Sequence, residues 1–194
     1  MDYLYVAKEI MDSYLTVSRN SVNALTLLIE VETIPKGTFF IKEKTKNEYD
    51  YFQFSGICRS YIVDHKGEEV TISFFQGKTV LTPNVARTFN NRSTLNFEAL
   101  TDLKLGRFKA IGLVELMKEM PELRNFANAV LQQELILKSN KELQNASLTA
   151  KERLVLFRKQ FQSLENLIPH HMIASYLGVT NVSLSRLRKE LAEG

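Results

Sequence analysis

The spacing of the apolar residues changes twice along the chain, and this change limits the fold more than any other feature of the sequence. Residues 1 to about 29 carry apolar side chains three and four positions apart, as on an amphipathic helix. From residue 29 to about 108 the chain instead contains short β-branched or aromatic runs. Helical spacing returns after residue 108 and continues to the end. The sequence therefore predicts an α+β protein with a β domain between helical segments.

The central runs predict antiparallel strands. They are separated by turn signals, namely PKG at 35–37, SG at 55–56 and HKG at 65–67. The runs themselves are IEVETI, GTFFIKE, DYFQFSG, CRSYIVD and EVTISFF. So many strands in so short a segment indicate a small antiparallel barrel or sandwich.

The segment after the strands contains a long helical pattern, LVELMKEMPELRNFANAVLQQELILKSNKELQ. Pro121 is expected to begin its second half, in which Leu123, Ala127, Val130 and Leu137 follow a roughly heptad course. Because a small β domain cannot cover so long a helix, we expect it to pair with a second copy, with Val130 and Leu137 in the interface. Packing of the helix on the β domain of its own chain is the alternative.

The last part of the chain carries the excess positive charge. Thr149 and Glu152 have the spacing of a capping box, which indicates that a new helix begins there. Residues 149–194 contain seven Lys and Arg against four Glu, whereas the preceding part is neutral. This asymmetry is typical of a small nucleic-acid-binding module, although a solvated basic helix has the same composition. The domains expected are 1–112 (helices and β domain), 113–146 (dimerisation helix) and 147–194 (DNA-binding domain).

The stretch IASYLGVTNVSLSRLRKEL, residues 173–191, contains two short helical patterns joined at Gly178. Ala174 is small enough for close helix approach, Gly178 can adopt the positive φ of a tight turn, and Leu184 supplies an apolar anchor. This spacing predicts a helix-turn-helix, whose second helix enters the major groove of DNA. Ordinary packing of two amphipathic helices is the alternative.

The side chains expected to contact DNA lie opposite the leucines of the second helix. Arg186 can donate two hydrogen bonds to guanine, Asn181 can pair with adenine, and Val182 can touch a thymine methyl group. Arg188 and Lys189 are expected to meet phosphates. Thr180 can cap this helix, and Ser183 and Ser185 are small enough to let it approach the groove. The predicted DNA-binding residues are Thr180, Asn181, Val182, Ser183, Ser185, Arg186, Arg188 and Lys189.

With this order of elements the chain resembles the cyclic-AMP receptor protein / fumarate–nitrate reduction regulator (Crp/Fnr) family of bacterial transcription factors. YFQFSGICRSYIVDHKGEEVTISFF is similar to the family's strand pairs around a Gly-containing hairpin, and the C-terminal motif is similar to that of such regulators in Bacteroidetes. The resemblance implies an N-terminal antiparallel β-roll of the cyclic-nucleotide-binding jelly-roll type, a long dimerisation helix and a C-terminal helix-turn-helix. It also implies a homodimer that binds a near-palindromic operator in double-stranded DNA and alters promoter use by RNA polymerase.

The resemblance also identifies Arg92 and Ser93 as candidate effector-binding residues. In cyclic-nucleotide-binding members a Gly-Glu pair, whose Glu holds the ribose, precedes an Arg-Ser pair that holds the cyclic phosphate. Here Arg92 and Ser93 match the second pair, whereas Leu81 and Thr82 occupy the positions of the first. We therefore expect no control by cyclic AMP. Arg92 is then either a ligand for another anion or an ordinary loop residue.

Other classes of function lack their sequence signals. SFFQGKT fails as a phosphate-binding P-loop because Ile72 stands at the position of its first glycine. No Ser nucleophile motif or HExxH motif occurs, and Cys58 alone, expected to be buried, cannot hold an iron–sulfur or zinc site, so we expect no enzyme, metal or cofactor. Neither a membrane-spanning run nor a signal peptide occurs, which predicts a cytoplasmic protein. The alternative function is a ligand-sensing β-roll protein whose C-terminal helices bind another protein.

Overall fold

The computed structural model describes residues 2–193, which form two compact units. The first unit comprises Met1–Arg59 and Phe74–Ile136, and the second comprises Ser60–Ser73 and Leu137–Gly194. The predicted α+β class is confirmed, because antiparallel strands are preceded and followed by helices. None of the helices described has the length and apolar character that a membrane span requires.

The N-terminal helical pattern forms two helices, α1 (Tyr3–Tyr14) and α2 (Arg19–Thr26). The Asp2 side chain accepts hydrogen bonds from the first backbone N–H groups of α1. Ser18 caps α2 by accepting a hydrogen bond from the Ser21 N–H. This second cap explains why the continuous apolar pattern is divided, since a residue with a capping side chain and extended backbone begins a new helix.

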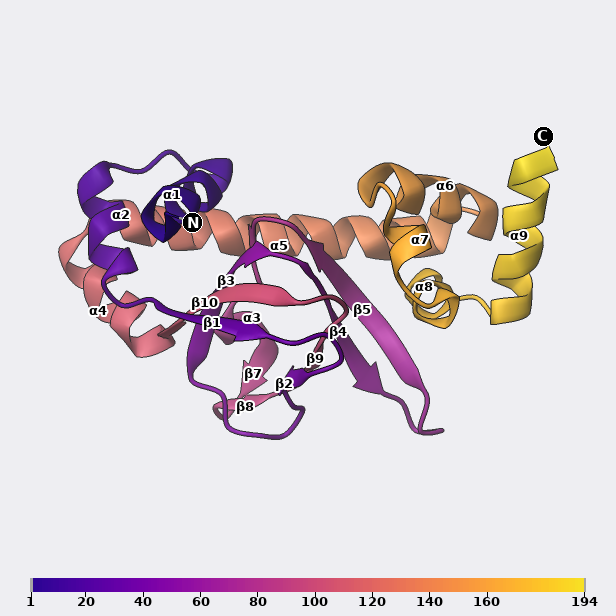
Figure 1. Ribbon diagram of the computed structural model, residues 1–194, viewed down its shortest axis with the longest axis horizontal. Coiled ribbons are helices and arrows are strands. Elements are labelled where there is room, and N and C mark those ends of the chain that lie inside the picture. Colours follow the sequence, from indigo (N-terminus) through magenta and orange to yellow (C-terminus); the bar gives the residue numbers. More distant parts are fainter. Residues whose placement is uncertain (1, 194) are drawn as a thin grey trace. The chain divides into compact units, whose positions relative to one another are not determined.

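Two four-stranded sheets form the β domain (Figure 1). The first sheet has, in spatial order, β1 (Glu30–Ile34), β10 (Leu103–Lys109), β3 (Tyr49–Ser55) and β6 (Thr79–Val80). The second has β2 (Phe39–Ile41), β9 (Asn96–Ala99), β4 (Ile57–Val63) and β5 (Glu69–Gln76). A short helix, α3 (Asn84–Arg87), precedes a small hairpin of β7 (Thr88–Phe89) and β8 (Arg92–Ser93). The five runs predicted as strands are confirmed as β1 to β5.

Gly56 marks the point where the chain passes from one sheet to the other. It joins β3 to β4, which lie in different sheets, and its φ is +95°. A Cβ atom at this position would lie 2.5 Å from the carbonyl oxygen of Asp102, so only glycine fits. The true hairpin follows between β4 and β5, where the Asp64 N–H donates to the Glu68 carbonyl at 2.9 Å.

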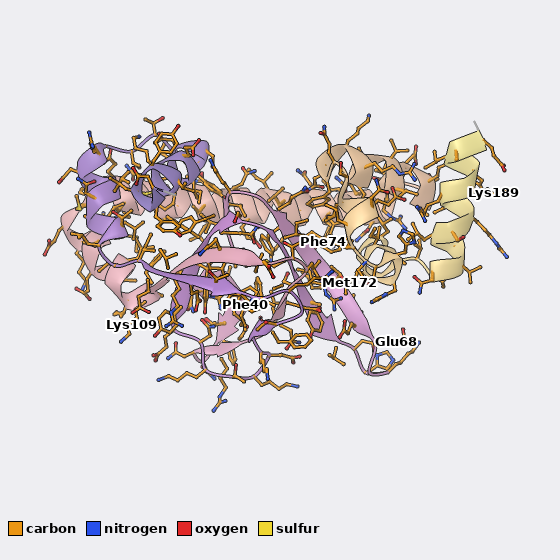
Figure 2. The ribbon with its side chains drawn as sticks, viewed as in Figure 1. Phe40, Glu68, Phe74, Lys109, Met172 and Lys189 are labelled. Carbon is orange, nitrogen blue, oxygen red and sulfur yellow. The ribbon has the colours of Figure 1, made fainter. Side chains whose placement is uncertain are left out.

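Aromatic side chains fill the first unit. Phe40 lies between the two sheets, with ring centroids 6.1 Å from Tyr51 and 5.9 Å from Phe97 (Figure 2). A second cluster joins α1 and α2 to the first sheet, and there the Phe52 ring lies 5.5 Å from Phe108. Cys58 is fully buried, as the sequence predicts.

The long helix contributes to this core and corrects one expectation. It follows α4 (Ala110–Glu119), begins at Pro121 as predicted, and runs as α5 over Pro121–Ser147. Phe126 and Val130 are 2% and 5% exposed and pack with α1 and α2 of the same chain. Val130 therefore belongs to the core of its own chain, and its placement in a subunit interface is wrong. Leu137 is 47% exposed.

The second unit ends in four helices, α6 (Ala150–Gln160), α7 (Leu164–Leu167), α8 (His170–Leu177) and α9 (Asn181–Glu193). The predicted capping box at the start of α6 is confirmed. The Glu152 N–H donates to Thr149 Oγ1 at 3.3 Å, and the Thr149 N–H donates to Glu152 Oε2 at 2.8 Å. These reciprocal bonds satisfy two backbone groups that the helix cannot pair internally.

Candidate nucleic-acid interface

Helices α8 and α9 form a helix-turn-helix around Gly178. Gly178 has φ +66° and ψ +37°, the left-handed conformation that ends α8. The Val179 N–H then returns to the Ala174 carbonyl at 3.0 Å, which closes the turn. Ala174 is 2% exposed, so the small side chain predicted for close helix approach is indeed buried. The turn predicted from the sequence is therefore present at the predicted glycine.

Leu184 anchors α9 to the rest of the unit. Its side chain is 1% exposed, and apolar residues of α6, α7 and α8, and those directly after α6 and α7, are also buried. These residues are Leu154, Phe157, Phe161, Leu164, Ile168, Met172, Ile173 and Leu177. Truncation of such a buried leucine to alanine costs about 2–5 kcal/mol of folding free energy. The second helix is thus held in one orientation by its apolar side.

The opposite side of α9 presents the residues that we call the recognition face: Asn181, Val182, Ser185, Arg186 and Lys189. All five are exposed, and the apolar Val182 is 61% exposed. Among residues 2–193 the Arg186 side chain has no hydrogen-bond or ion-pair partner. Lys189 lies on the outer side of α9 (Figure 2), 3.6 Å from Glu193 in a solvated pair that contributes little to stability. This face therefore has donors that are free to contact a ligand.

Thr180 and Ser183 serve the helix itself. Thr180 Oγ1 accepts a hydrogen bond from the Ser183 N–H at 3.1 Å, and the two hydroxyl oxygens lie 2.9 Å apart. Thr180 is thus the N-cap that the sequence predicts, and Ser183 is its partner. Both fix the start of α9, where the exposed residues of the recognition face begin.

Arg188 lies outside the recognition face. Its Nε donates to Glu165 Oε1 at 2.6 Å, and its Nη1 lies 3.2 Å from His170 Nδ1. Glu165 also binds Arg158 through Nε at 2.6 Å and Nη2 at 3.0 Å. These hydrogen bonds, first Arg158 and then Arg188, lower the pKa of Glu165 below its ordinary value against the opposing effect of burial. The structure therefore places Arg188, expected to meet phosphate, in an ion-pair network that joins α6, α7 and α9.

The candidate effector residues are occupied by bonds within the β domain. Arg92 is exposed and its Nη1 donates to the Lys44 carbonyl at 2.7 Å. Ser93 is 2% exposed, and its hydroxyl donates to the Leu95 carbonyl at 2.7 Å. Thr82, at the position of the family's glutamate, is also buried at 2% exposure.

Arg87 is a buried charge that the sequence analysis did not identify. It is 0% exposed, and its guanidinium lies over the rings of Tyr51 and Phe97 at 5.5 and 5.8 Å from their centroids. Its Nε donates to the Thr82 carbonyl at 2.9 Å, while its Nη1 has no partner within residues 2–193. Desolvation lowers the pKa of Arg87. An arginine in the sequence NVARTF carries no signal that separates it from an exposed one.

The part of the chain that the structure describes contains no group of three or more His, Cys, Asp or Glu side chains arranged to hold a metal ion. The Cys58 thiol donates to Gln53 Oε1 at 3.2 Å, and burial raises its pKa.

Solved structures of bacterial regulators are similar to this chain. FixK2 from Bradyrhizobium japonicum matches with a TM-score of 0.74 and 20% identity, covering 85% of each chain. The c-di-GMP-responsive global regulator CLP of Xanthomonas campestris matches with a TM-score of 0.71 and 14% identity, covering 91% of this chain and 92% of CLP. A Crp/Fnr-family transcriptional regulator from Eubacterium rectale matches with a TM-score of 0.70 and 20% identity, over 92% and 85% of the two chains.

These similarities concern the fold. No protein-family model matches the chain, and no curated protein matches its sequence. The structural matches nevertheless extend over most of this chain and of the proteins that it matches. The chain therefore has the fold of Crp/Fnr regulators, as the sequence predicted.

Proposed function

We propose that this protein is a sequence-specific DNA-binding transcription regulator whose recognition face enters the major groove. One observation carries the proposal: the second helix of a helix-turn-helix exposes Asn181, Val182, Ser185, Arg186 and Lys189 together, while Leu184 holds its other side in the core. A helix in this position presents its N-terminal residues to base edges.

The chemistry of the recognition face suits base contacts near its start and phosphate contacts further on. Arg186 has the fork of donors that binds guanine O6 and N7, and Asn181 can pair with adenine. Val182 offers an apolar surface to a thymine methyl group, and Ser185 is small enough to allow close approach. Lys189 carries a mobile point charge, which suits phosphate more than a particular base.

We infer a homodimer, and the exposed side of α5 supports it. Leu131, Leu135, Ile136 and Leu143 are 36%, 66%, 53% and 65% exposed. Successive residues of a helix are rotated by about 100°, so these four side chains lie on the side of α5 opposite to Val130 and Phe126. Val130 and Phe126 pack in their own chain. An apolar stripe opposite an already buried side needs a second body, and a second copy of α5 provides a matching stripe. Two copies would bind a near-palindromic operator and act on promoter use by RNA polymerase.

The N-terminal part is proposed to act without cyclic-nucleotide control. The Ser93 hydroxyl is bonded to the Leu95 carbonyl of its own chain, and Leu81 and Thr82 replace the glycine and the ribose-binding glutamate. In this proposal residues 1–112 form a sensor-like domain, 113–146 the dimerisation helix and 147–194 the DNA-binding domain, in a cytoplasmic protein.

Selection of bound sequences from random duplex DNA tests this function. Enrichment of an inverted repeat with a constant separation of half-sites is expected, and failure to enrich any sequence would contradict the proposal. In the alternative function the C-terminal helices bind a protein. Binding measured at several salt concentrations distinguishes this alternative from DNA binding. DNA binding through several Lys and Arg must weaken steeply as salt rises, whereas an apolar protein contact need not.

A further inference from the structure

The hairpin between β4 and β5 makes polar contacts with the first helix of the helix-turn-helix. Its residues Ser60–Ser73 belong to the same compact unit as the C-terminal helices. The Thr71 N–H donates to Ser175 Oγ on α8 at 3.2 Å, and that hydroxyl donates to Thr71 Oγ1 at 3.0 Å. Because Thr71 is 1% exposed, its backbone N–H cannot turn to bulk water instead. The Ser175 hydroxyl is therefore a hydrogen-bond acceptor for this buried N–H group.

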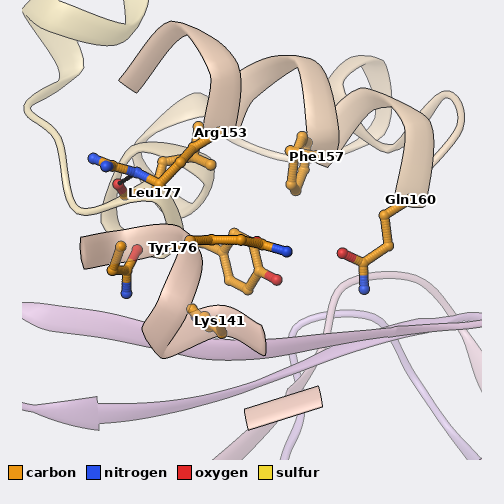
Figure 3. A pocket seen from close by; sticks show the side chains of 8 residues that line it. Lys141, Arg153, Phe157, Gln160, Tyr176 and Leu177 are labelled. Atoms are coloured by element: carbon orange, nitrogen blue, oxygen red, sulfur yellow. Dashed lines mark hydrogen bonds between the residues drawn. The ribbon is translucent and has the colours of Figure 1, made fainter. Parts of the chain in front are cut away.

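Lys141 of α5 joins the same contact from a third element. Its Nζ donates to the Ile72 carbonyl at 2.7 Å. The same Nζ lies 3.7 Å from the centroid of the Tyr176 ring, and Figure 3 shows these two side chains. An ammonium over an aromatic face is attracted by the negative electrostatic potential of the neutral ring's face, and more strongly when water is excluded. Desolvation, with a smaller contribution from Lys138, lowers the pKa of Lys141 to about 8. We call Thr71, Ile72, Lys141, Ser175 and Tyr176 the hairpin contact.

The hairpin contact supplements a short covalent link. Helix α5 ends at Ser147 and α6 begins at Ala150, so only Leu148 and Thr149 connect them. The four C-terminal helices are one packed body, in which the Tyr176 ring contacts Phe157 at 5.7 Å between centroids. A short link alone permits such a body to rotate, whereas additional contacts on α8 restrict it.

We propose that Lys141, Thr71 and Ser175 are positioning residues, which fix the helix-turn-helix against α5 and the β4–β5 hairpin so that a dimer accepts one separation of half-sites. None of the three belongs to the recognition face, so they act through the orientation of α8 and α9. This inference rests on the proposed DNA-binding function.

The separation of half-sites gives a readout that simple loss of stability would not change. One inserted base pair moves a half-site by about 3.4 Å and rotates it by about 35°. A rigidly held pair of helix-turn-helix units cannot follow, and we expect the wild-type protein to lose about tenfold or more in affinity. Helix-turn-helix units released from the hairpin contact can move with the displaced half-site. The loss of affinity caused by the inserted base pair should then be no more than about threefold.

Lys141→Met tests the lysine, because methionine keeps an apolar stem but removes the charge and the donor. Ser175→Ala tests the hydroxyl independently, and Lys159→Met, on an exposed position of α6, is the matched control. Affinities are measured on the selected operator, on operators with one or two inserted base pairs, and on an isolated half-site. Both test variants should lose the spacing penalty and keep the affinity for the isolated half-site, while Lys159→Met should match the wild-type protein. An unchanged spacing penalty in folded Lys141→Met and Ser175→Ala overturns the proposal.

Hydrogen exchange examines the hairpin contact without DNA. The Thr71 amide should exchange about tenfold faster or more in Ser175→Ala than in the wild-type protein, because its acceptor is gone. If the wild-type chain selects no DNA sequence, the proposed function fails while exchange still reports on the contact. If exchange accelerates but the spacing penalty remains, the contact exists and its positioning role is refuted. Unchanged exchange refutes the contact itself.

Discussion

Arg186 and Lys189 both lie on the recognition face, but their head groups bind DNA differently. The planar guanidinium of Arg186 can form two parallel hydrogen bonds to guanine, whereas the ammonium of Lys189 is a mobile point charge. Arg186→Ala should therefore cost about 1–3 kcal/mol on the selected operator and relax the base preference at one position of each half-site. Lys189→Ala should weaken all sequences alike and lower the salt slope by about one unit. Binding measured on the operator and on single-base variants at several salt concentrations separates the two.

Arg188 supplies the internal control for that experiment. It is on the same helix, but its guanidinium is bound to Glu165. Arg188→Ala should lower the melting temperature slightly, since the partly solvated pair contributes at most about 1 kcal/mol, and should leave the base preference intact. If Arg188→Ala relaxed the base preference and Arg186→Ala did not, the assignment of the recognition face would be wrong.

At the level of the element, α5 has two sides with different neighbours. Val130 packs in the core of its own chain at 5% exposure, whereas Leu135 is 66% exposed on the opposite side. Leu135→Asp should convert a dimer to a folded monomer, because the charge would lose water in the paired helices. Val130→Asp should instead lower the free energy of unfolding by about 3 kcal/mol or more, since it buries an unpaired charge within the chain. Sedimentation and thermal denaturation distinguish these outcomes, and a Leu135→Asp protein that remains dimeric would exclude this side as the interface.

The same helix shows how far the sequence predicts the structure. Its apolar spacing predicts a long helix beginning at Pro121, which is confirmed, but spacing alone does not say which apolar side meets which body. The turn at Gly178 and the anchor Leu184 are predictable because both depend on residues a few positions apart. Arg188 is different, because its partner Glu165 comes from another helix. Lys141 likewise meets Ile72, 69 positions away, and no local pattern indicates such a contact.

For the whole molecule, the first question is whether cyclic nucleotides change DNA binding. The Ser93 hydroxyl is bonded to Leu95, and the glycine and glutamate that would complete the family's site are absent. We expect no binding of cyclic AMP or cyclic GMP tighter than about 1 µM by calorimetry. Arg92→Ala should accordingly leave operator affinity unchanged, because Arg92 only donates to the Lys44 carbonyl on the surface. Submicromolar affinity for either nucleotide would contradict this prediction.

The stability of the whole chain should depend on pH through Lys141. Desolvation lowers its pKa from 10.5 to about 8, so between these values the unfolded chain binds the proton that the folded chain has released. Stability from this group therefore rises as pH increases through 8 and levels off near 10.5. The ring of Tyr176 acts in the other direction, since it favours the ammonium.

Other groups titrate in the same range with the opposite sign. Burial raises the pKa of the Cys58 thiol and of the Tyr176 hydroxyl. The folded chain therefore becomes less stable as pH rises above the value at which each group ionises in the unfolded chain. The wild-type profile is therefore the sum of opposing slopes, and the difference between wild type and Lys141→Met isolates the lysine. Measured by denaturant unfolding, that difference should increase in favour of the wild type by about 2–3 kcal/mol between pH 7 and pH 10. Parallel profiles would show that Lys141 has the same pKa in the folded and the unfolded chain, and would contradict this prediction.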